Sequence, residues 1–374
     1  MTSIGFLSSA PPTPCGIATF TSALGEVLTK RSFDVTVVRV LDEPESAESD
    51  PAVIGELIGS DPSTIGGAVR ALNECDLAII QHEYGLYGGS DGSDVLEVLG
   101  ALKVPSIAVL HTVLSHPSPH QVEVLNAVIR RSSAVVVMTA SAEATLRSVN
   151  DVGTTPLSVI AHGAALGRPT SHGLDGARPL LLTWGLLGPG KGVQWVIDAL
   201  ISLRDLQPQP HYLIAGRTHP KVLAHQGDLY RESLEQRVVA NGVQNLVEFD
   251  NSYRDLPSLN LLIESATVVL LPYDSHDQAT SGVLVDAIAA GRPVIATAFP
   301  HAVELLSTGA GIVVPHGDVD ALSIALRRTL TEPGLLEEMT SEARRLAPGL
   351  GWGGVAVQYQ ELINRILQRV TIEA

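Results

Sequence analysis

Short apolar runs alternate with longer amphipathic stretches along almost the whole chain, and this alternation limits the fold more than any other feature. Brief aliphatic runs are typical of strands, whereas apolar residues spaced three or four apart are typical of helices. Repeated strand-helix-strand units predict an α/β fold, with mostly parallel sheets covered by helices. In the first half of the chain the predicted strands are residues 3–8, 34–40, 77–83, 106–112, 134–139 and 157–163.

The alternation stops at residues 164–179, a polar stretch with Gly and Pro, and then starts again. Such a stretch is typical of a linker between domains, and 374 residues exceed what one hydrophobic core usually serves. We therefore predict an N-terminal domain at 1–163 and a C-terminal domain at 180–350. A last helix at about 352–370 follows a glycine-rich break that would let it cross back onto the first domain. The strands predicted in the second half are 179–185, 211–216, 246–251, 266–273, 293–297 and 311–315.

Composition agrees with buried parallel strands and excludes some partners. Hydrophobic residues make up 45% of the chain but aromatic residues only 4%, so the core must be mainly aliphatic. The formal charge of −16 argues against nucleic-acid binding. Only two cysteines occur, and no stretch approaches the roughly 18 apolar residues of a membrane helix. We predict a cytoplasmic protein, monomer or homodimer, without a transmembrane segment; peripheral membrane contact stays open.

The segment at 183–200 places a glycine-rich turn between a predicted strand and a predicted helix, with Lys191 at the helix entry. Main-chain N–H groups of Gly190, Lys191 and Gly192 would meet an anion there, and a diphosphate is the obvious guest. The segment is not a P-loop, because no Ser or Thr follows the lysine. The alternative is a tight turn that carries an exposed lysine.

A second polar segment, at 274–297, opens a predicted helix. Thr280 or Ser281 would cap this helix, and its first amides would face an anion; these are the amides of Ser281, Gly282 and Val283. Asp277 and Asp286 lie too far apart to share one helical turn, so the loop acid would face a sugar and the helix acid would lie deeper. The alternative is that Asp277 or Thr280 only caps the helix and Asp286 is a surface charge.

Three histidines, His82, His111 and His162, each occur at the end of a predicted strand. Corresponding ends of one sheet lie together, so the three would share a ligand-facing edge, although a single histidine is more often structural. Asp318 and Asp320 form a D-x-D pattern of the kind used to bind metals. This pattern opens a predicted helix, so capping explains it better, and we predict no metal site.

Taken together, these segments resemble glycosyltransferase family 4, the retaining enzymes of the GT-B fold, and in particular a bacterial and actinobacterial subgroup. The likeness to the donor half lies at 185–192, 214–234, 277–297 and 298–306; the likeness to the acceptor half lies at 10–24, 81–89, 109–113 and 159–163. The resemblance implies two Rossmann-like domains facing across a cleft. It also implies transfer of a hexose from a GDP- or UDP-sugar to a hydroxyl acceptor, which would be a glycan, a lipid-linked molecule or a small molecule, with no obligate cofactor or metal.

The resemblance also implies roles for single residues on the donor side. Lys191 matches the lysine that binds the donor diphosphate. Family members carry two acids in an E-x7-E pattern, the first near the transferred sugar and the second on the ribose, and the second matches Asp286. Strict spacing places the first at Gln278, whereas the acid is its neighbour Asp277, so either takes the sugar-binding role. The subgroup pattern acid-Gln-x-Thr-Ser-Gly matches Asp277, Gln278, Thr280, Ser281 and Gly282.

Other positions differ from the family or belong to its acceptor half. The usual arginine of the glycine-rich turn is Leu186 here, and Arg217 is our candidate for the second cation, with a salt bridge on the rim as the alternative. Gly16 would let the backbone approach the donor phosphates. The resemblance favours His111 for the sugar and acceptor environment. The next candidates on the acceptor side are His82, Glu83 and His162.

Two other functions remain compatible with this sequence. One is a catalytically silent subunit that binds a nucleotide sugar, which Leu186 and Gln278 make plausible. The other is a nucleotide-sugar epimerase of the same fold. A dinucleotide oxidoreductase fits poorly, because neither half carries the G-x-G-x-x-G fingerprint after its first strand.

Overall fold

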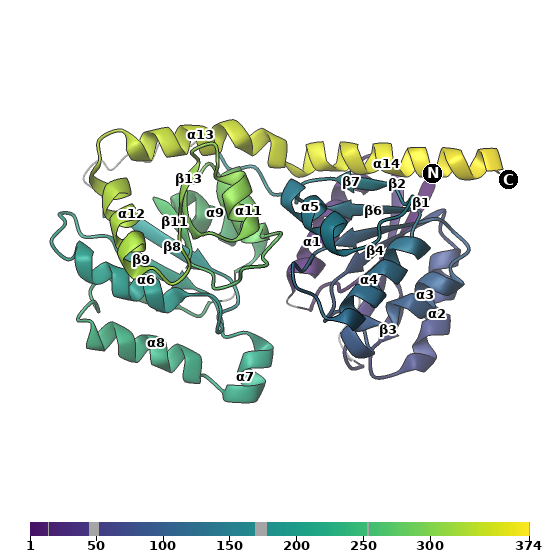
Figure 1. Cartoon of the computed structure of the whole chain (residues 1–374), viewed down its shortest axis with the longest axis horizontal. Coiled ribbons are helices and arrows are strands. Elements are labelled where there is room, and N and C mark those ends of the chain that lie inside the picture. The colour runs from purple at the N-terminus through teal and green to yellow at the C-terminus, as the bar shows by residue number, and fades with distance from the viewer. Residues whose placement is uncertain (14, 45–51, 169–177, 253, 374) are drawn as a thin grey trace. The chain divides into compact units, whose positions relative to one another are not determined.

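The computed structural model describes residues 1–13, 15–44, 52–168, 178–252 and 254–373 (Figure 1). The chain divides into two compact units: the first comprises residues 1–163 and 352–374, and the second comprises residues 164–351. Most of the predicted linker, residues 169–177, lies outside the described residues. In the described part of the chain, each unit is built on one sheet, with seven strands in the first and six in the second.

The sheet of the first unit is parallel throughout, with the order β3-β2-β1-β4-β5-β6-β7. Its central strands are mainly apolar because helices bury them on both faces. β3 was not predicted, because this edge strand carries Gly55 and Glu56 between its apolar residues. The strands are β1 (Thr2–Ser8), β2 (Phe33–Leu41), β3 (Val53–Ile58), β4 (Leu77–His82), β5 (Ser106–Leu110), β6 (Ala134–Val137) and β7 (Leu157–Val159).

One core joins the first and the last helix of the chain within the first unit. α1 (Gly16–Thr29) buries Phe20, Leu24 and Leu28, which lie four residues apart and so share one helical face. The long C-terminal helix α14 (Trp352–Glu373) contributes Tyr359 and other apolar residues to the same core. The other helices of this unit are α2 (Ile65–Asn73), α3 (Val95–Ala101), α4 (Pro119–Arg131) and α5 (Ala140–Val149), with short 3-10 turns at Pro62–Thr64 and Ser90–Gly92.

The second unit repeats the design with a parallel sheet of order β10-β9-β8-β11-β12-β13. Its strands are β8 (Leu180–Trp184), β9 (His211–Ala215), β10 (Val247–Asp250), β11 (Val268–Leu271), β12 (Val294–Thr297) and β13 (Gly311–Val314). Its helices are α6 (Val193–Ala199), the 3-10 turn Leu200–Leu203, α7 (Pro220–Gln226), α8 (Leu229–Ala240), α9 (Leu256–Ser265), α10 (Gly282–Ala289), α11 (Pro300–Leu305), α12 (Val319–Thr331) and α13 (Leu335–Leu350). This pair of parallel sheets confirms the predicted α/β class with two Rossmann-like domains.

The break predicted before the last helix is much shorter than expected. α13 continues through Pro348 and Gly349, and α14 starts at Trp352, so that Gly351 alone separates the two helices. Gly353 and Gly354 lie in the first turn of α14, where backbone N–H groups have no partner within the helix. Glycine residues therefore mark a helix boundary here rather than a loop.

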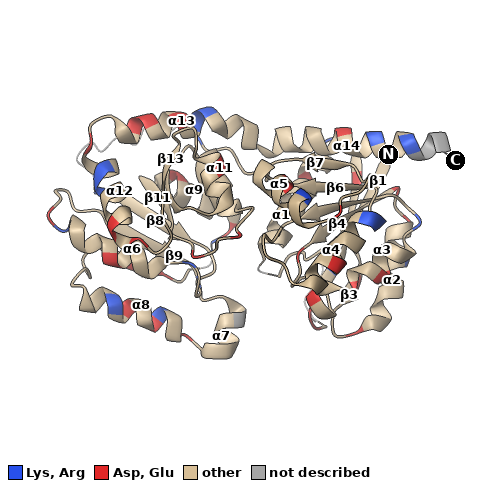
Figure 2. Ribbon diagram, viewed as in Figure 1, with Lys and Arg blue, Asp and Glu red and all other residues tan. Residues whose placement is uncertain are grey.

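Charges of both signs are interspersed on the helices (Figure 2). On α8 and α13, for example, basic side chains pair with acidic ones one turn away, as in Arg231–Glu235 and Arg345–Glu342. Such neutralised pairs do not form the basic stripe that a phosphate backbone requires. Of the described helices, none combines the length and the apolar character that crossing a membrane requires.

The strand directions of the second unit bring distant segments to one edge. All neighbouring strands are parallel, so their carboxyl ends lie along the same edge, where ligands bind in open α/β sheets. β8 ends at Trp184, β9 at Ala215 and β11 at Leu271. The segments that follow these strands therefore lie together, and they include both regions predicted to bind an anion.

Candidate functional site

The glycine-rich turn after β8 lies directly against the end of β11. Gly190 and Gly192 have φ angles of 90° and 65°, a left-handed conformation that favours glycine. A Cβ atom on Gly192 would be 1.6 Å from the carbonyl oxygen of Pro272. Glycine is therefore required at this position, because it lets the turn approach the backbone that follows β11.

The side chain of Lys191 lies over the Tyr273 ring, next to this contact. Its Nζ lies 4.3 Å from the centroid of the Tyr273 ring, a cation–π arrangement, and the N–H of Asp274 donates to the carbonyl oxygen of Gly190 at 2.9 Å. We predicted that the backbone amide of Lys191 would face an anion, but this amide donates to the carbonyl oxygen of Gly188 at 3.1 Å and closes the turn. The positive charge of Lys191, rather than its amide, is the group this turn offers to an anion.

α10 begins at the same edge, after the loop that follows β11. Ser281 is its N-cap, and the Ser281 hydroxyl accepts from the N–H of Leu284 at 3.3 Å. The expectation that the Ser281 amide faces an anion is wrong, because this amide donates to Nδ1 of His301 at 2.9 Å. The next two amides, those of Gly282 and Val283, have no acceptor within the helix and remain the candidates.

Asp286 lies one turn further along α10 and is partly buried. Removal of its carboxyl from water raises its pKa from 3.8 to about 7. A solvated surface carboxyl would not be shifted in this way, so the alternative of a surface charge is excluded. Perturbed carboxyls of this kind are common at functional sites.

Gln278 has a structural role in the loop before α10. Its side-chain amide donates to the carbonyl oxygen of Thr280 at 2.6 Å. Its backbone carbonyl oxygen accepts from the N–H of His301 at 3.3 Å. Thr280 is itself buried. Asp277, half-buried, accepts at its backbone oxygen from the N–H of Ala279 at 2.7 Å. The Gln278 side chain is thus committed to holding the loop in shape.

Arg217 follows β9 and lies beside the glycine-rich segment. The N–H of Leu187 donates to the carbonyl oxygen of Arg217 at 2.8 Å, and the Arg217 side chain is exposed, with its Nε donating to the carbonyl oxygen of Asn251 at 3.2 Å. Leu186, which occupies the place of the family's arginine, is half-buried. The backbone of Arg217 therefore lies beside the segment that carries Lys191, while its side chain reaches the carbonyl oxygen of Asn251.

In the first unit, Gly16 is the first residue of α1 and is exposed. A Cβ atom at Gly16 would meet no atom within 4 Å. The preceding N-cap, Cys15, makes no side-chain capping hydrogen bond. The first turn of α1 therefore opens onto free space and offers backbone amides that no cap side chain satisfies.

The ring of His111 and that of His162 gather around Phe20, with centroids 5.1 Å from it in each case. Nε2 of His111 lies 2.6 Å from Oε1 of Gln81, and Nδ1 of His162 lies 2.7 Å from the carbonyl oxygen of Gly163. Burial lowers the pKa of His111 to about 3 and that of His162 to about 4. Both imidazoles are neutral at physiological pH, and the ring nitrogen that each has left can accept a hydrogen bond from a hydroxyl, but neither ring can neutralise a phosphate.

His82 departs from the prediction that all three histidines face a ligand. Its side chain is 0% exposed, and within the described part of the chain its two ring nitrogens have no hydrogen-bond partner. Burial lowers its pKa to about 4. The neighbouring Glu83 is half-buried and accepts from the N–H of Gly85 at 2.8 Å, which shapes the loop after β4. His82 is therefore a core residue, and Glu83 partly a turn residue.

Two places in the second unit carry residue types that bind metals: the start of α12 at Asp318, and a separate group of three side chains. Asp318 caps α12 by accepting from the N–H of Ala321 at 2.8 Å, as expected of a D-x-D pattern at a helix start. Asp274, His276 and His316 lie together elsewhere and carry ligand atoms that suit a metal ion. Sequence reasoning missed this group, because His316 follows β13 while the other two follow β11.

Comparison with known proteins finds a family model that matches part of this chain. Residues 178–332 match the family model described as "Glycosyl transferases group 1". The matched residues lie within the second unit and include the Lys191 turn, Arg217 and α10.

Two curated proteins that match about half of the chain are glycosyltransferases. The α-D-kanosaminyltransferase of Streptomyces kanamyceticus is 29% identical over 178 residues, which are 47% of this chain and 42% of that protein. The lipopolysaccharide glucosyltransferase WaaG of Escherichia coli K12 is 28% identical over 180 residues, which are 47% of this chain and 44% of that protein. Each match spans less than half the length of the relative.

Solved structures resemble the chain over nearly all of its length. Sucrose-phosphate synthase from Thermosynechococcus elongatus has a TM-score of 0.79 at 19% identity, covering 99% of this chain and 100% of that one. Anabaena Alr3699/HepE, solved in complex with UDP-glucose, has a TM-score of 0.75 at 18% identity, covering 98% and 100%. At these identities the likeness shows the fold, which is GT-B.

Proposed function

We propose that the protein is a retaining glycosyltransferase of the family 4 type, which moves a hexose from a nucleotide-diphosphate sugar to a hydroxyl acceptor without needing a metal ion for the transfer. One observation carries this proposal: the glycine-rich turn packs on Pro272, at the start of the segment that leads into α10. This contact joins a lysine, a helix N-terminus and a partly buried acid at one edge of the sheet. Together these groups suit a nucleoside diphosphate.

The donor diphosphate is bound by charge and by backbone amides. Lys191 supplies the charge, and Gly282 and Val283 supply amides at the positive end of α10. Arg217 adds a second cation in place of the family's arginine. Asp286 accepts a hydrogen bond from a ribose hydroxyl. This bond is strong because water does not compete with the hydroxyl for the carboxyl.

Asp277, rather than Gln278, is the residue that contacts the transferred sugar. The Gln278 side chain already donates to Thr280 within the loop. Asp277 lies beside it and carries the carboxylate that sugar hydroxyls need as an acceptor. This choice resolves the departure from strict E-x7-E spacing in favour of the acid.

Transfer requires that the bond between the anomeric carbon and the diphosphate oxygen breaks while the acceptor oxygen forms a new bond to that carbon. The electron pair of the broken bond stays on the diphosphate, where Lys191 and the α10 amides stabilise it. Preorganised donors of this kind contribute about 3–4 kcal/mol each in other enzymes. The acceptor proton passes to the departing phosphate oxygen on the same face of the sugar, which preserves the anomeric configuration.

The acceptor is recognised by the first unit. His111 and His162 are neutral, and each donates its ring N–H within the protein, to Oε1 of Gln81 and to the carbonyl oxygen of Gly163. The other ring nitrogen of each can therefore accept a hydrogen bond from a sugar hydroxyl. Glu83 lies on the loop that follows β4, at the same edge of the sheet. The open first turn of α1 at Gly16 offers additional backbone donors.

The donor base is proposed from a structural neighbour. Anabaena Alr3699/HepE was solved with UDP-glucose, and we propose a UDP-hexose for this chain as well. A thermal-shift and calorimetric comparison of UDP, GDP and their glucose and mannose forms tests this choice. A ligand at about 100 times its dissociation constant adds about 2.7 kcal/mol to the stability of the folded state. Tighter binding of GDP than of UDP would overturn the choice of base.

The Lys191→Ala variant tests the site itself. A charge-assisted hydrogen bond contributes about 1.5–3 kcal/mol, so UDP should bind about 10- to 100-fold more weakly. Lys103→Ala, which removes an exposed lysine of the first unit, is the matched control and should bind UDP as the wild type does. Unchanged UDP affinity in Lys191→Ala would refute the assignment of the diphosphate site.

Turnover separates transfer from the two other functions. Release of UDP from UDP-glucose, with formation of a glycoside or free glucose, supports transfer. Binding without release of UDP would support a silent subunit. Conversion of the donor into its epimer with the nucleotide still attached would support an epimerase.

A further inference from the structure

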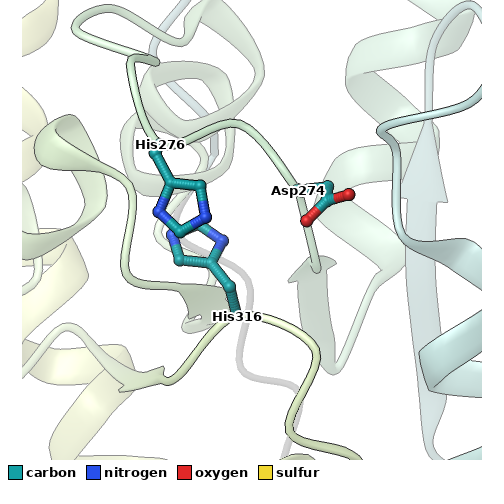
Figure 3. A group of neighbouring side chains, drawn as sticks. All are labelled: Asp274, His276 and His316. Carbon is teal, nitrogen blue, oxygen red and sulfur yellow. The ribbon is translucent and has the colours of Figure 1, made fainter. Parts of the chain in front are cut away.

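Asp274, His276 and His316 form a compact group on two loops of the second unit. Asp274 and His276 follow β11, and His316 lies between β13 and α12. Each offers one ligand atom, and these three atoms all lie within 4.8 Å of one another (Figure 3). Figure 3 shows the two imidazole rings lying over one another, with one carboxylate oxygen of Asp274 turned towards them.

His316 is arranged as a metal ligand is. Its Nδ1 lies 2.9 Å from the carbonyl oxygen of Tyr273. A carbonyl oxygen only accepts, so Nδ1 carries the ring proton and Nε2 carries the lone pair. Within the described part of the chain this Nε2 is buried and has no hydrogen-bond partner. A metal-bound histidine typically donates its other ring N–H to a backbone carbonyl in this way.

The other two ligands can close around an ion. The His276 ring centroid is 4.0 Å from that of His316, and the backbone of Asp274 is fixed by its N–H bond to Gly190 at 2.9 Å. A tetrahedral ion at about 2.0–2.1 Å from each ligand holds the ligands about 3.3–3.4 Å apart. Asp274 and His276 are exposed, so an ion can reach them and their side chains have room to turn towards this spacing.

We propose that Asp274, His276 and His316 bind a divalent transition-metal ion of the Zn²⁺ type, with a fourth position open to water or another ligand. Two imidazoles and one carboxylate suit Zn²⁺, whereas Mg²⁺ and Ca²⁺ prefer oxygen ligands. The ion ties the loop that leads into α10 to the loop between β13 and α12. This site stands whether or not the chain transfers a sugar.

Metal binding by the full chain tests the proposal without any nucleotide. The experiment uses protein prepared without a histidine tag and stripped of metal with a chelator. This protein is titrated with Zn²⁺ in competition with a chromophoric chelator. We expect one strongly bound Zn²⁺ per chain, and no comparable binding of Mg²⁺. Absence of a strong Zn²⁺ site, or equal binding of Mg²⁺, would overturn the proposal.

Three variants locate the ion. Asp274→Asn, His276→Ala and His316→Gln should each weaken Zn²⁺ binding at least about tenfold, whereas His225→Ala, which removes an exposed histidine of α7, should leave it unchanged. The first two changes are at exposed side chains, so these variants should melt as the wild type does without metal. Strong Zn²⁺ binding that survives both would overturn the proposal. UDP affinity, measured separately with metal absent, shows whether the nucleotide site has failed instead.

Discussion

The substitution Asp286→Asn should make the second unit less sensitive to alkaline pH. Burial raises the pKa of the Asp286 carboxyl from 3.8 to about 7. Between these two values the unfolded chain has released the proton while the folded chain still holds it. The folded state then binds more protons than the unfolded state, so the free energy of unfolding falls as pH rises.

The size of this effect follows from the pKa shift. At 1.36 kcal/mol per pKa unit, the rise from 3.8 to about 7 corresponds to about 4 kcal/mol. The whole stabilisation is present below pH 3.8 and is lost as pH rises to about 7, after which the curve is flat. Because Asp286 keeps some contact with solvent, about 4 kcal/mol is the upper limit. Asparagine has the shape of the protonated acid and carries no such penalty.

Differential scanning calorimetry between pH 4.5 and 8.5 measures this difference. A change of 1 kcal/mol shifts Tm by about 2–4 °C in a unit of this size. The variant should melt close to the wild type at the acid end and up to about 8–16 °C higher at the alkaline end. Since the chain has two units, the comparison uses the transition that responds to the substitution rather than one two-state fit.

Asp320→Asn is the matched control, because it removes an exposed acid from the first turn of α12 in the same unit. Its Tm should follow the wild type in parallel over the whole pH range. If Asp286→Asn also runs parallel to the wild type, the carboxyl is already ionised at low pH and the argument from burial is refuted.

Three other substitutions have defined outcomes in thermal unfolding. Gly192→Ala would place its Cβ 1.6 Å from the Pro272 oxygen at a φ of 65°, so it should cost about 2–3 kcal/mol or more and lower Tm; an unchanged Tm would show that the turn can move freely. Ser281→Ala removes the hydroxyl that accepts from Leu284, and the loss of this cap should cost about 1 kcal/mol; a stable variant would contradict the capping role. Tyr359→Phe deletes a buried hydroxyl that has no hydrogen-bond partner within the described residues, so Tm should rise, and a fall would reveal a partner.

Local patterns were enough to find most of the strands. β1, β4 and β8 are short, mainly apolar runs because helices cover both faces of the sheets, and burial on both faces leaves few polar positions. The edge strand β3 was missed, since an edge tolerates Gly55 and Glu56. The same local logic found the Lys191 turn and narrowed the cap of α10 to Thr280 or Ser281, because glycine spacing and a cap residue are read over a few positions.

The local sequence could not show which polar groups remain free to bind a ligand. The amides of Lys191 and Ser281 looked free in the sequence, but the first closes its own turn and the second is bound by His301 from α11. His82 looked like His111, yet the core encloses it completely.

The sequence by itself determined most of the segments that become strands, since hydrophobic periodicity is a property of neighbouring residues. It also supplied the resemblance to a glycosyltransferase family, through the residues of the glycine-rich turn and of α10. Only the tertiary structure decided which polar groups stay available and which titrate unusually, such as Asp286, and it alone brought His316 to Asp274 and His276. The physical reason is that hydrogen-bond partners, burial and metal-ligand spacing depend on atoms contributed by segments far apart in the chain.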